Sequence, residues 1–460
     1  MRRTIRTDAL KRLYILVTAF VMVTFETAMV IYCLNRYYNP QFRTQLYFRG
    51  HVLMALIYIA MIVFVGRVFG GLLIGLRKSG EVIFSQFFTV LFSNAAFYVL
   101  MVLQAFKFPN VIPLIRITAI ELIVAFLWIR FMGEGFVRIF KPVNTLLIYQ
   151  NGSVEEFKER LEKKTDTLSV TDYISADEDF ETVKKKIDGF NTVMVWDISS
   201  SKRNRIFKYC YERSKRIYSV PNVTDIIFNG ARPVHLFDTP LLLTDANPIQ
   251  YEERVIKRTF DIVFSILLII LLSPLMLLTA VIIKLSDGGP VLYRQIRCTK
   301  NMKEFKILKF RSMIVDAEKS GVPRLAAKKD PRITPVGAVI RKLRIDELPQ
   351  LFNVLKGEMS FVGPRPERPE FIKKYIEEIP EFVYRTKIRA GITGYAQLYG
   401  KYNTKPYDKL KFDLYYMEQY SLRLDVQLML LTLKIIFTKE STEGVKEDGT
   451  DSGIDSNTGS

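Results

Sequence analysis

Four long apolar runs occupy the first 140 residues of the chain, at roughly 13–34, 52–76, 84–106 and 111–132. Each run is about the length that an α-helix needs to cross a bilayer. The first run follows a basic cluster, is too long for the core of a signal peptide and lacks a small-residue cleavage site, so we expect it to be retained. The pattern predicts a four-helix transmembrane bundle over residues 1–141.

The basic residues around these runs indicate how the bundle is oriented. Positive charge marks the cytoplasmic side of a membrane helix. With four spans, the cations at 2–12, 77–78 and 138–141 fall on one side, although the loop with Arg36, Arg43 and Arg49 weighs against this. Two carboxyl groups, Glu26 and Glu121, lie inside the runs. They either line a polar pathway or form hydrogen bonds between helices, and the second interpretation is the simpler one.

Residues 142–250 follow a different pattern. Strand-like segments at 144–149, 191–198 and 216–221 alternate with helix-like segments at 154–164 and 201–215, which predicts an open α/β sheet. In a dinucleotide-binding fold the first strand leads into G-x-G-x-x-G. Here it leads into "YQNG" (149–152), whose single glycine does not let the backbone approach a pyrophosphate closely. We expect a degenerate Rossmann-like module with a regulatory or structural role.

A fifth apolar run covers 260–285 and is long enough to span a membrane. Ser273-Pro274 lies near its middle. Proline removes a backbone hydrogen bond and clashes with the preceding turn, so the helix should kink or break there. A broken helix can enter and leave the membrane on the same face. Length alone favours a full span.

Composition narrows the class of protein. The chain has 460 residues, of which 49% are hydrophobic and 25% charged, with a net charge of +19. The mean hydropathy of +0.12 fits membrane segments joined to charged soluble parts. The basic balance suits anionic lipids or phosphorylated substrates, and with these membrane segments we expect no nucleic-acid partner. Three cysteines without C-x-x-C spacing and only two histidines argue against a disulfide framework, a zinc site and a Ser-His-Asp triad.

Cations are dense directly after the fifth run. "SDGGPVLYRQIR" (286–297) contains Arg294, and "FKILKFRSM" (305–313) contains Lys309 and Arg311. Cations at this density beside a membrane helix suit either anionic headgroups or substrate phosphates.

Two carboxylates, Asp316 and Glu318, follow these cations. Side chains at i and i+2 do not share a helix face, so a joint site requires a turn or a helix start, where free N–H groups favour anions. A carboxylate beside cations stays ionised at neutral pH, which suits a nucleophile or a Mg²⁺ ligand. The alternative is ordinary surface charge.

Further along, the stretch 337–356 is compatible with a helix and carries Asp346 and Glu347 before Leu348-Pro349. The segment "PRPERP" (364–369) predicts a stiff non-helical path that presents Arg365. Such a loop can hold a guanidinium against a diphosphate, or it can be an exposed polyproline turn.

Taken together, residues 254–440 resemble the catalytic domain of the bacterial sugar transferases. These are the polyprenyl-phosphate hexose-1-phosphate transferases, a monotopic phosphoglycosyl transferase family. The resemblance rests on six segments: "KRTFDI" (257–262), the Ser-Pro pair, "GPVLYRQ" (289–295), "KFRSM" (309–313), "IDELPQLFNVLKGEMSFVGPRPE" (345–367) and "RAGITGYAQ" (389–397). The N-terminal spans and the α/β module resemble the long members, such as the undecaprenyl-phosphate galactose and glucose phosphotransferases.

The resemblance implies a two-step reaction. A carboxylate attacks the sugar-bearing phosphorus of a UDP-sugar and releases UMP, and the phosphosugar then passes to undecaprenyl phosphate, with Mg²⁺ neutralising the diphosphate. By motif, Asp316 is the nucleophile and Glu318 the second carboxylate, and both would hold the metal; Ala317 separates two residues that are adjacent in some members. The residues expected to contact phosphate are Arg294, Lys309, Arg311 and Arg365. Two acids, Asp346 and Glu347, are expected near them.

The resemblance also implies an architecture. We expect a membrane protein with mixed α and α/β structure in four parts: the bundle at 1–141, the Rossmann-like module at 142–250, a re-entrant helix broken at Ser273-Pro274 with a mainly α-helical catalytic domain at 251–439, and a disordered tail at 440–460. The catalytic domain should face the bacterial cytoplasm, since five true spans would place it away from the nucleotide pool. The transmembrane bundle is a candidate surface for contact between two copies of the chain in a homodimer.

Three other functions remain open at this level. A glycosyltransferase that moves only the sugar would release UDP instead of UMP. A transporter of lipid-linked sugars would leave the soluble motifs without a role. A nucleotide sensor built on 142–250 lacks the expected glycines. One departure from the family is "IRCTKNMKEF" (296–305), which has none of the glycines that members often carry there.

Overall fold

The computed structural model describes residues 2–150, 157, 168–245, 247–315, 330–400 and 404–436. The chain divides into two compact units, Met1–Val220 and Pro221–Ser460. Each unit is described by itself. Helices and strands are mixed across the chain, and several of the helices are long and apolar, as the sequence predicts.

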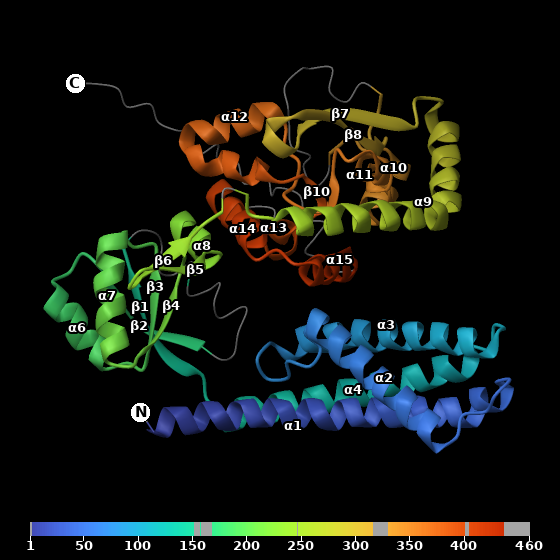
Figure 1. Cartoon of the computed structure of the whole chain (residues 1–460), viewed down its shortest axis with the longest axis horizontal. Helices are drawn as coiled ribbons and strands as arrows, with labels where there is room; N and C mark the ends of the chain where they lie inside the picture. The colour runs from blue at the N-terminus through green and yellow to red at the C-terminus, as the bar shows by residue number, and fades with distance from the viewer. Residues whose placement is uncertain are drawn as a thin grey trace. The chain divides into compact units, whose positions relative to one another are not determined.

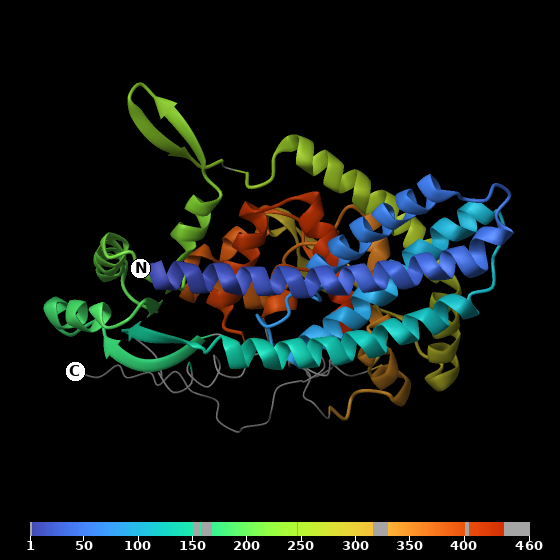
Figure 2. The ribbon, with the colours of Figure 1, turned by 90° about the horizontal axis from the view of Figure 1, so that it is seen from below.

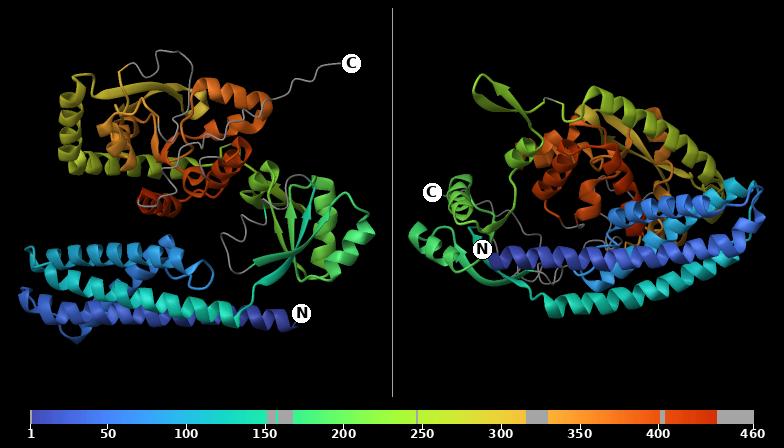
Figure 3. Two further views of the ribbon diagram at one scale, coloured as in Figure 1. Left: turned by 180° about the vertical axis from the view of Figure 1, so that it is seen from behind. Right: turned by 60° about the horizontal axis from the view of Figure 1, so that its bottom comes forward.

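The four N-terminal apolar runs form four long helices in the first unit: α1 (Arg2–Cys33), α2 (Phe48–Phe69), α3 (Ser79–Ala105) and α4 (Ile112–Ile139). Each of them, and a fifth helix in the second unit, is long and apolar enough to cross a membrane. α1 continues into a short π-helix, η1 (Leu34–Tyr38), and a 3₁₀ turn, η2 (Asn39–Gln41). α2 ends before residue 76 because Gly70 adopts a left-handed conformation (φ 82°) that caps the helix. Figure 3 shows α1 and α4 side by side.

Polar side chains join the four helices inside the bundle. The Gln86 side-chain amide donates to Glu26 Oε1 at 2.7 Å, and the Asn94 amide donates to Glu121 Oε2 at 2.6 Å. The Tyr58 hydroxyl in turn donates to Asn94 Oδ1 at 2.7 Å. Both carboxyl groups within the apolar runs therefore form hydrogen bonds between helices.

The second part of this unit is a parallel four-stranded sheet in the order β2-β1-β3-β4. Its strands are β1 (Val143–Tyr149), β2 (Leu168–Ser175), β3 (Thr192–Trp196) and β4 (Arg216–Ser219), and its helices are α6 (Phe180–Asp188) and α7 (Ser200–Glu212). Apolar residues of α6 and α7 form one core with β1 and β3. The predicted alternation of strands and helices is present, but β2 was not predicted, because polar residues interrupt its pattern. Of the predicted helix at 154–164, the structure describes residue 157, which is helical.

The second unit begins with α8 (Val223–Asn229) and a hairpin, β5 (Arg232–Leu236) and β6 (Thr239–Leu243), whose residues are all exposed. Figure 2 shows this hairpin standing apart from the rest of its unit. The long helix α9 (Tyr251–Asp287) follows. A second hairpin comes next, formed by β7 (Leu292–Cys298) and β8 (Glu304–Phe310) around the short turn η3 (Lys300–Met302). The sequence pattern did not indicate this hairpin.

α9 contains Pro274 and turns sharply within its length (Figure 1). A residue other than proline at 274 would donate its N–H to the carbonyl of Ile270, four residues earlier. The Ser273 hydroxyl donates to that carbonyl instead, at 2.8 Å. The Ser-Pro pair therefore bends the helix while leaving the carbonyl with a donor, and the predicted kink is present.

The remaining elements form the compact core of the unit. They are α10 (Pro335–Lys342), η4 (Ile345–Glu347), α11 (Gln350–Lys356), β9 (Ser360–Val362), α12 (Pro369–Glu378), η5 (Pro380–Lys387), β10 (Gly391–Thr393), α13 (Tyr395–Tyr399), α14 (Pro406–Glu418) and α15 (Leu422–Ile436). The stretch 337–356 is not one helix. Arg344 takes a left-handed conformation (φ 55°) and Pro349 follows, so the chain divides into α10, η4 and α11. The predicted tail at 440–460 lies outside the described residues.

Candidate functional site

The β7–β8 hairpin positions Lys309. Side chains alternate between the two faces of a strand. Phe305 and Ile307 on one face of β8 are buried in the main core, and Lys309 continues that face beyond the apolar residues. Its side chain is 22% exposed, and its ammonium group reaches the short helix η4. The hairpin thus holds a cation at the edge of the core.

The η4 turn carries the two adjacent acids, Asp346 and Glu347. Glu347 accepts from Lys309 Nζ at 3.1 Å through Oε1 and pairs with Arg344 Nη1 at 3.4 Å through Oε2. Arg365 Nη2 lies 3.9 Å from Glu347 Oε1. We call Lys309, Arg344, Glu347 and Arg365 the Glu347 cluster. Three cations thus surround one carboxylate that is only 14% exposed.

The surroundings of the two acids of η4 shift their pKa values in opposite directions. Burial raises the pKa of Glu347, but the charges of Lys309, Arg365 and Arg344 outweigh this and lower that pKa below its usual range. Burial, and then the charge of Glu347, raise the pKa of Asp346 to about 6. Environments that separate the pKa values of two neighbouring carboxyls are typical of sites that use them for different roles.

A buried arginine, Arg385, binds the backbone of the loop 364–368, which contains Arg365. Arg385 is 3% exposed and donates from Nη2 to the carbonyl of Arg365 at 3.2 Å. The same guanidinium pairs with Asp413 at 2.8 Å and lies 3.9 Å from Glu367. Residues 364–368 form no helix, as the proline pattern predicts, and α12 begins at Pro369. The loop backbone that presents Arg365 is therefore fixed by contacts within the core.

Two predicted phosphate contacts lie elsewhere. Arg311 is 7% exposed and forms an ion pair with Asp287 at the end of α9. A Cβ atom at Gly289 would meet the guanidinium of Arg311, so a larger residue there would require the end of that side chain to move. Arg294 is exposed and pairs in register with Leu308, which places it on the face of the hairpin opposite to Lys309. The structure brings Lys309, Asp346, Glu347 and Arg365 together, and does not bring Arg294 to them.

Asp316 and Glu318 lie outside the described residues. The chain on either side of them is ordered: the Ile314 N–H donates to the Arg332 carbonyl at 2.9 Å, and the Thr334 N–H donates to the Ser312 carbonyl at 3.1 Å. Within the described ranges, no group of three or more His, Cys, Asp or Glu residues is arranged to hold a metal ion. Of the two acids of η4, Glu347 is already paired with three cations, whereas Asp346 is in no described ion pair.

The sequence did not predict Arg344 or the Arg385–Asp413 pair as parts of the site. Arg344 stands two residues before Asp346 in "RKLRIDELP" (341–349), and its proximity to the acids was the only available signal. Arg385 and Asp413 are distant in sequence from the Arg365 loop, and no motif connects them. Only the folded chain brings them together.

Comparison with known proteins identifies the class of protein. The family model described as "Bacterial sugar transferase" matches residues 252–439. A relative in Aeromonas hydrophila, named UDP-N-acetylgalactosamine-undecaprenyl-phosphate N-acetylgalactosaminephosphotransferase, is 43% identical over 48% of this chain and 52% of its own. A relative in Escherichia coli (strain K12), named UDP-glucose:undecaprenyl-phosphate glucose-1-phosphate transferase, is 40% identical over 45% of this chain and 43% of its own.

A third relative is matched over nearly its whole length. The exopolysaccharide production protein PSS of Rhizobium leguminosarum bv. phaseoli is 42% identical over 39% of this chain and 94% of its own. The chain belongs to the bacterial sugar transferase family, and its relatives named as phosphotransferases are enzymes. It spans about half the length of the first curated relatives that it matches.

Proposed function

We propose that the protein transfers a hexose-1-phosphate from a UDP-sugar to undecaprenyl phosphate, releases UMP and so begins the assembly of a surface glycan such as capsule or exopolysaccharide. The observation that carries this proposal is the Glu347 cluster, in which three cations surround one acid at the edge of a core, with Asp346 next to it in the chain. Phosphoryl transfer needs positioning and charge neutralisation above all. The names of the relatives supply the acceptor lipid and the class of transferred group.

The reaction we propose has two displacements at one phosphorus. A carboxylate oxygen attacks the sugar-bearing phosphorus of the UDP-sugar, the bond to the bridging oxygen breaks, and UMP leaves with that oxygen. A phosphate oxygen of undecaprenyl phosphate then attacks the same phosphorus. The carboxylate leaves, and the product is an undecaprenyl diphosphate sugar. Lys309, Arg344 and Arg365 would bind the diphosphate oxygens, since guanidinium and ammonium groups form strong charge-assisted bonds with phosphate.

Two pairs of carboxylates compete for the nucleophile's role. The family resemblance assigns it to Asp316 with Glu318. The contacts of the described residues support Asp346 instead, because this acid lies next to Glu347, where the cations for a diphosphate are already assembled. Asp346 makes no ion pair with any cation of the described chain, whereas Glu347 is shared between three. We infer that Asp346 is the stronger candidate and that Glu347 orients the cations.

In this proposal, Asp316 and Glu318 are the residues that would bind a Mg²⁺ ion. When bound there, it would neutralise part of the diphosphate charge. No step of the reaction above is routed through the ion.

We also propose that four helices of the first unit cross the membrane, that its sheet is a degenerate Rossmann-like module, and that α9 is re-entrant with the catalytic domain in the cytoplasm. Contacts of both arms of α9 support the last point. In the first arm, Arg258 donates to the carbonyls of Val354 and Leu355 at 2.7 and 2.8 Å. In the second arm, Ile283 is buried in one cluster with Phe310 and Ile340. A helix whose two arms pack on one domain returns to the side from which it started.

Nucleotide release tests the proposed function. Purified full-length protein is incubated with Mg²⁺, undecaprenyl phosphate and a panel of UDP-sugars, and the released nucleotide is identified by chromatography. We expect UMP with at least one sugar, and its loss in Asp346→Asn or Asp316→Asn. Release of UDP would show a glycosyltransferase and would refute the covalent mechanism.

The rate of UMP release should depend on pH through Asp346. This acid can attack phosphorus only when it is ionised, and its pKa is raised to about 6 by burial and by Glu347. We expect the rate to be level above about pH 7 and to fall roughly ten-fold per pH unit below the pKa. The Asp346→Glu variant, if active, should shift the midpoint. A profile that stays flat down to pH 5 would contradict a raised pKa for the attacking carboxylate.

A further inference from the structure

Three cations gather at the far end of the β7–β8 hairpin without an acidic partner. They are Arg254 in the first arm of α9, Lys300 in the η3 turn and Arg389 just before β10. Within the described part of the chain, no ion pair joins any of the three to a carboxylate. Arg254 Nε is buried and has no hydrogen-bond partner. We call these residues the Lys300 cluster.

Hydrogen bonds fix two of these cations beside each other. The Ala390 N–H donates to Thr299 Oγ1 at 3.2 Å, so Lys300 and Arg389 extend from residues that flank one bond. The Thr299 hydroxyl donates in turn to the Glu358 carbonyl at 2.8 Å. Burial, followed by the positive charges of Arg254 and Arg389, lowers the pKa of Lys300. All three side chains therefore share one small region.

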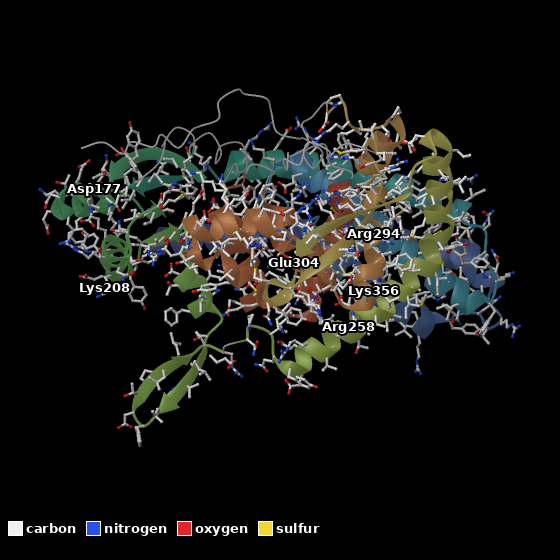
Figure 4. The ribbon with its side chains drawn as sticks, turned by 90° about the horizontal axis from the view of Figure 1, so that it is seen from above. Asp177, Lys208, Arg258, Arg294, Glu304 and Lys356 are labelled. Carbon is white, nitrogen blue, oxygen red and sulfur yellow. The ribbon has the colours of Figure 1, made fainter. Side chains whose placement is uncertain are left out.

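Two more cations border the cluster. Arg258, one turn along α9 from Arg254, holds the Leu355 carbonyl at 2.8 Å, which places it beside Lys356 at the end of α11. Figure 4 labels both residues, together with Arg294 and Glu304 of the hairpin. Uncompensated like charges repel one another, and the arrangement is stable only when an anion or solvent screens them.

This region is separate from the Glu347 cluster. The two strands of the hairpin pair from Leu292 with Phe310 at one end to Cys298 with Glu304 at the other. Six steps of about 3.4 Å place the η3 turn roughly 20 Å from the end that carries Lys309. A single phosphate cannot touch both clusters.

The setting of the Lys300 cluster indicates what the anion is. Val255 and Ile256, next to Arg254, are 49% and 52% exposed, and the strongly apolar part of α9 follows directly. Basic residues at the start of a membrane-associated helix attract anionic lipid headgroups. The apolar side chains would meet the acyl chains while the cations meet the phosphate.

We propose that Arg254, Lys300 and Arg389 form a second phosphate site, which binds the headgroup of an anionic membrane phospholipid and is distinct from the site of transfer. The bound lipid fixes the depth and tilt of α9 and thereby the height of the Glu347 cluster above the membrane. This binding does not depend on the reaction that we propose for the enzyme.

Native mass spectrometry of the full-length protein tests the site. The protein is reconstituted in nanodiscs that contain phosphatidylglycerol and phosphatidylcholine, released into detergent, and the retained lipids are counted. We expect wild type to retain phosphatidylglycerol, and the triple variant Arg254→Gln/Lys300→Gln/Arg389→Gln to retain roughly ten-fold less or lower still. Retention that is unchanged in the triple variant would overturn the proposal.

A matched control separates a defined site from general surface charge. Lys373→Gln/Lys374→Gln/Lys405→Gln removes the same charge from exposed positions of the same unit. It should retain phosphatidylglycerol as wild type does, and an equal loss in this control would refute a defined site. Displacement of the lipid by millimolar inorganic phosphate would show a site for small anions and would also refute the lipid assignment. Thermal unfolding of each variant confirms that loss of lipid is not loss of fold.

Discussion

Asp346→Asn is expected to lower the rate of UMP release by roughly 1,000-fold or more, with little change in stability. Asparagine matches aspartate in shape but cannot attack phosphorus as an anion, and losses of this order follow the removal of a covalent nucleophile. The variant should fold, because burial already raises the pKa of Asp346 to about 6 and therefore favours its uncharged form. Initial rates from a UMP assay, with a thermal unfolding curve for each protein, give both quantities.

Asp316→Asn, measured in parallel, decides between the two candidate nucleophiles. Digestion and mass spectrometry of enzyme incubated with UDP-sugar alone should locate the phosphosugar on the peptide that contains Asp346. An adduct on the peptide that contains Asp316 would support the family-based assignment and leave Asp346 a positioning role. Asp408→Asn provides a control, since its side chain is 49% exposed and, among the described residues, forms an ion pair with Lys411 one turn along the same helix. Its rate should equal that of wild type.

The sequence predicted the parts of the fold that depend on local pattern. The four apolar runs became α1 to α4, and the alternation after them became a parallel sheet. Ser273-Pro274 bends α9 because proline removes one backbone donor, a local effect. The β7–β8 hairpin was missed, since its strands carry cations at positions where an apolar alternation would normally signal a sheet. The predicted helix at 337–356 was too long, because the left-handed backbone conformation of Arg344 cannot be inferred from its residue type.

The candidate site was predicted only in part, because contacts between distant segments decide which of the predicted side chains come together. Lys309, Arg365, Asp346 and Glu347 were chosen as residue types suited to phosphate, and the fold does bring them together. Arg311 and Arg294 have the same chemistry, but one is occupied by Asp287 and the other lies on the opposite face of the hairpin. Which cation is available depends on strand register and on long-range ion pairs. A single sequence does not reveal either.

Lys257→Met is expected to lower the free energy of unfolding of the second unit by about 3–5 kcal/mol. The Lys257 ammonium lies 2.6 Å from Asp425 and 3.1 Å from the Tyr416 hydroxyl, and the two charged side chains are 10% and 2% exposed. Removing the cation leaves Asp425 buried without its partner, and burial already raises the pKa of this acid. Denaturant unfolding of the full-length protein in detergent, followed by near-UV circular dichroism, measures the change.

The double variant Lys257→Met/Asp425→Leu shows why the pair matters. Replacing both charges by apolar side chains removes the cost of the orphaned carboxyl, so most of the lost stability should return. Lys373→Met, at an exposed position of α12, should change stability by less than about 0.5 kcal/mol. A loss below 1 kcal/mol in Lys257→Met would show that the pair does not anchor α9. If the expected loss is found, the start of α9 is fixed to α15 by a buried ion pair. The helix then cannot shift in the membrane without moving the domain that carries the Glu347 cluster.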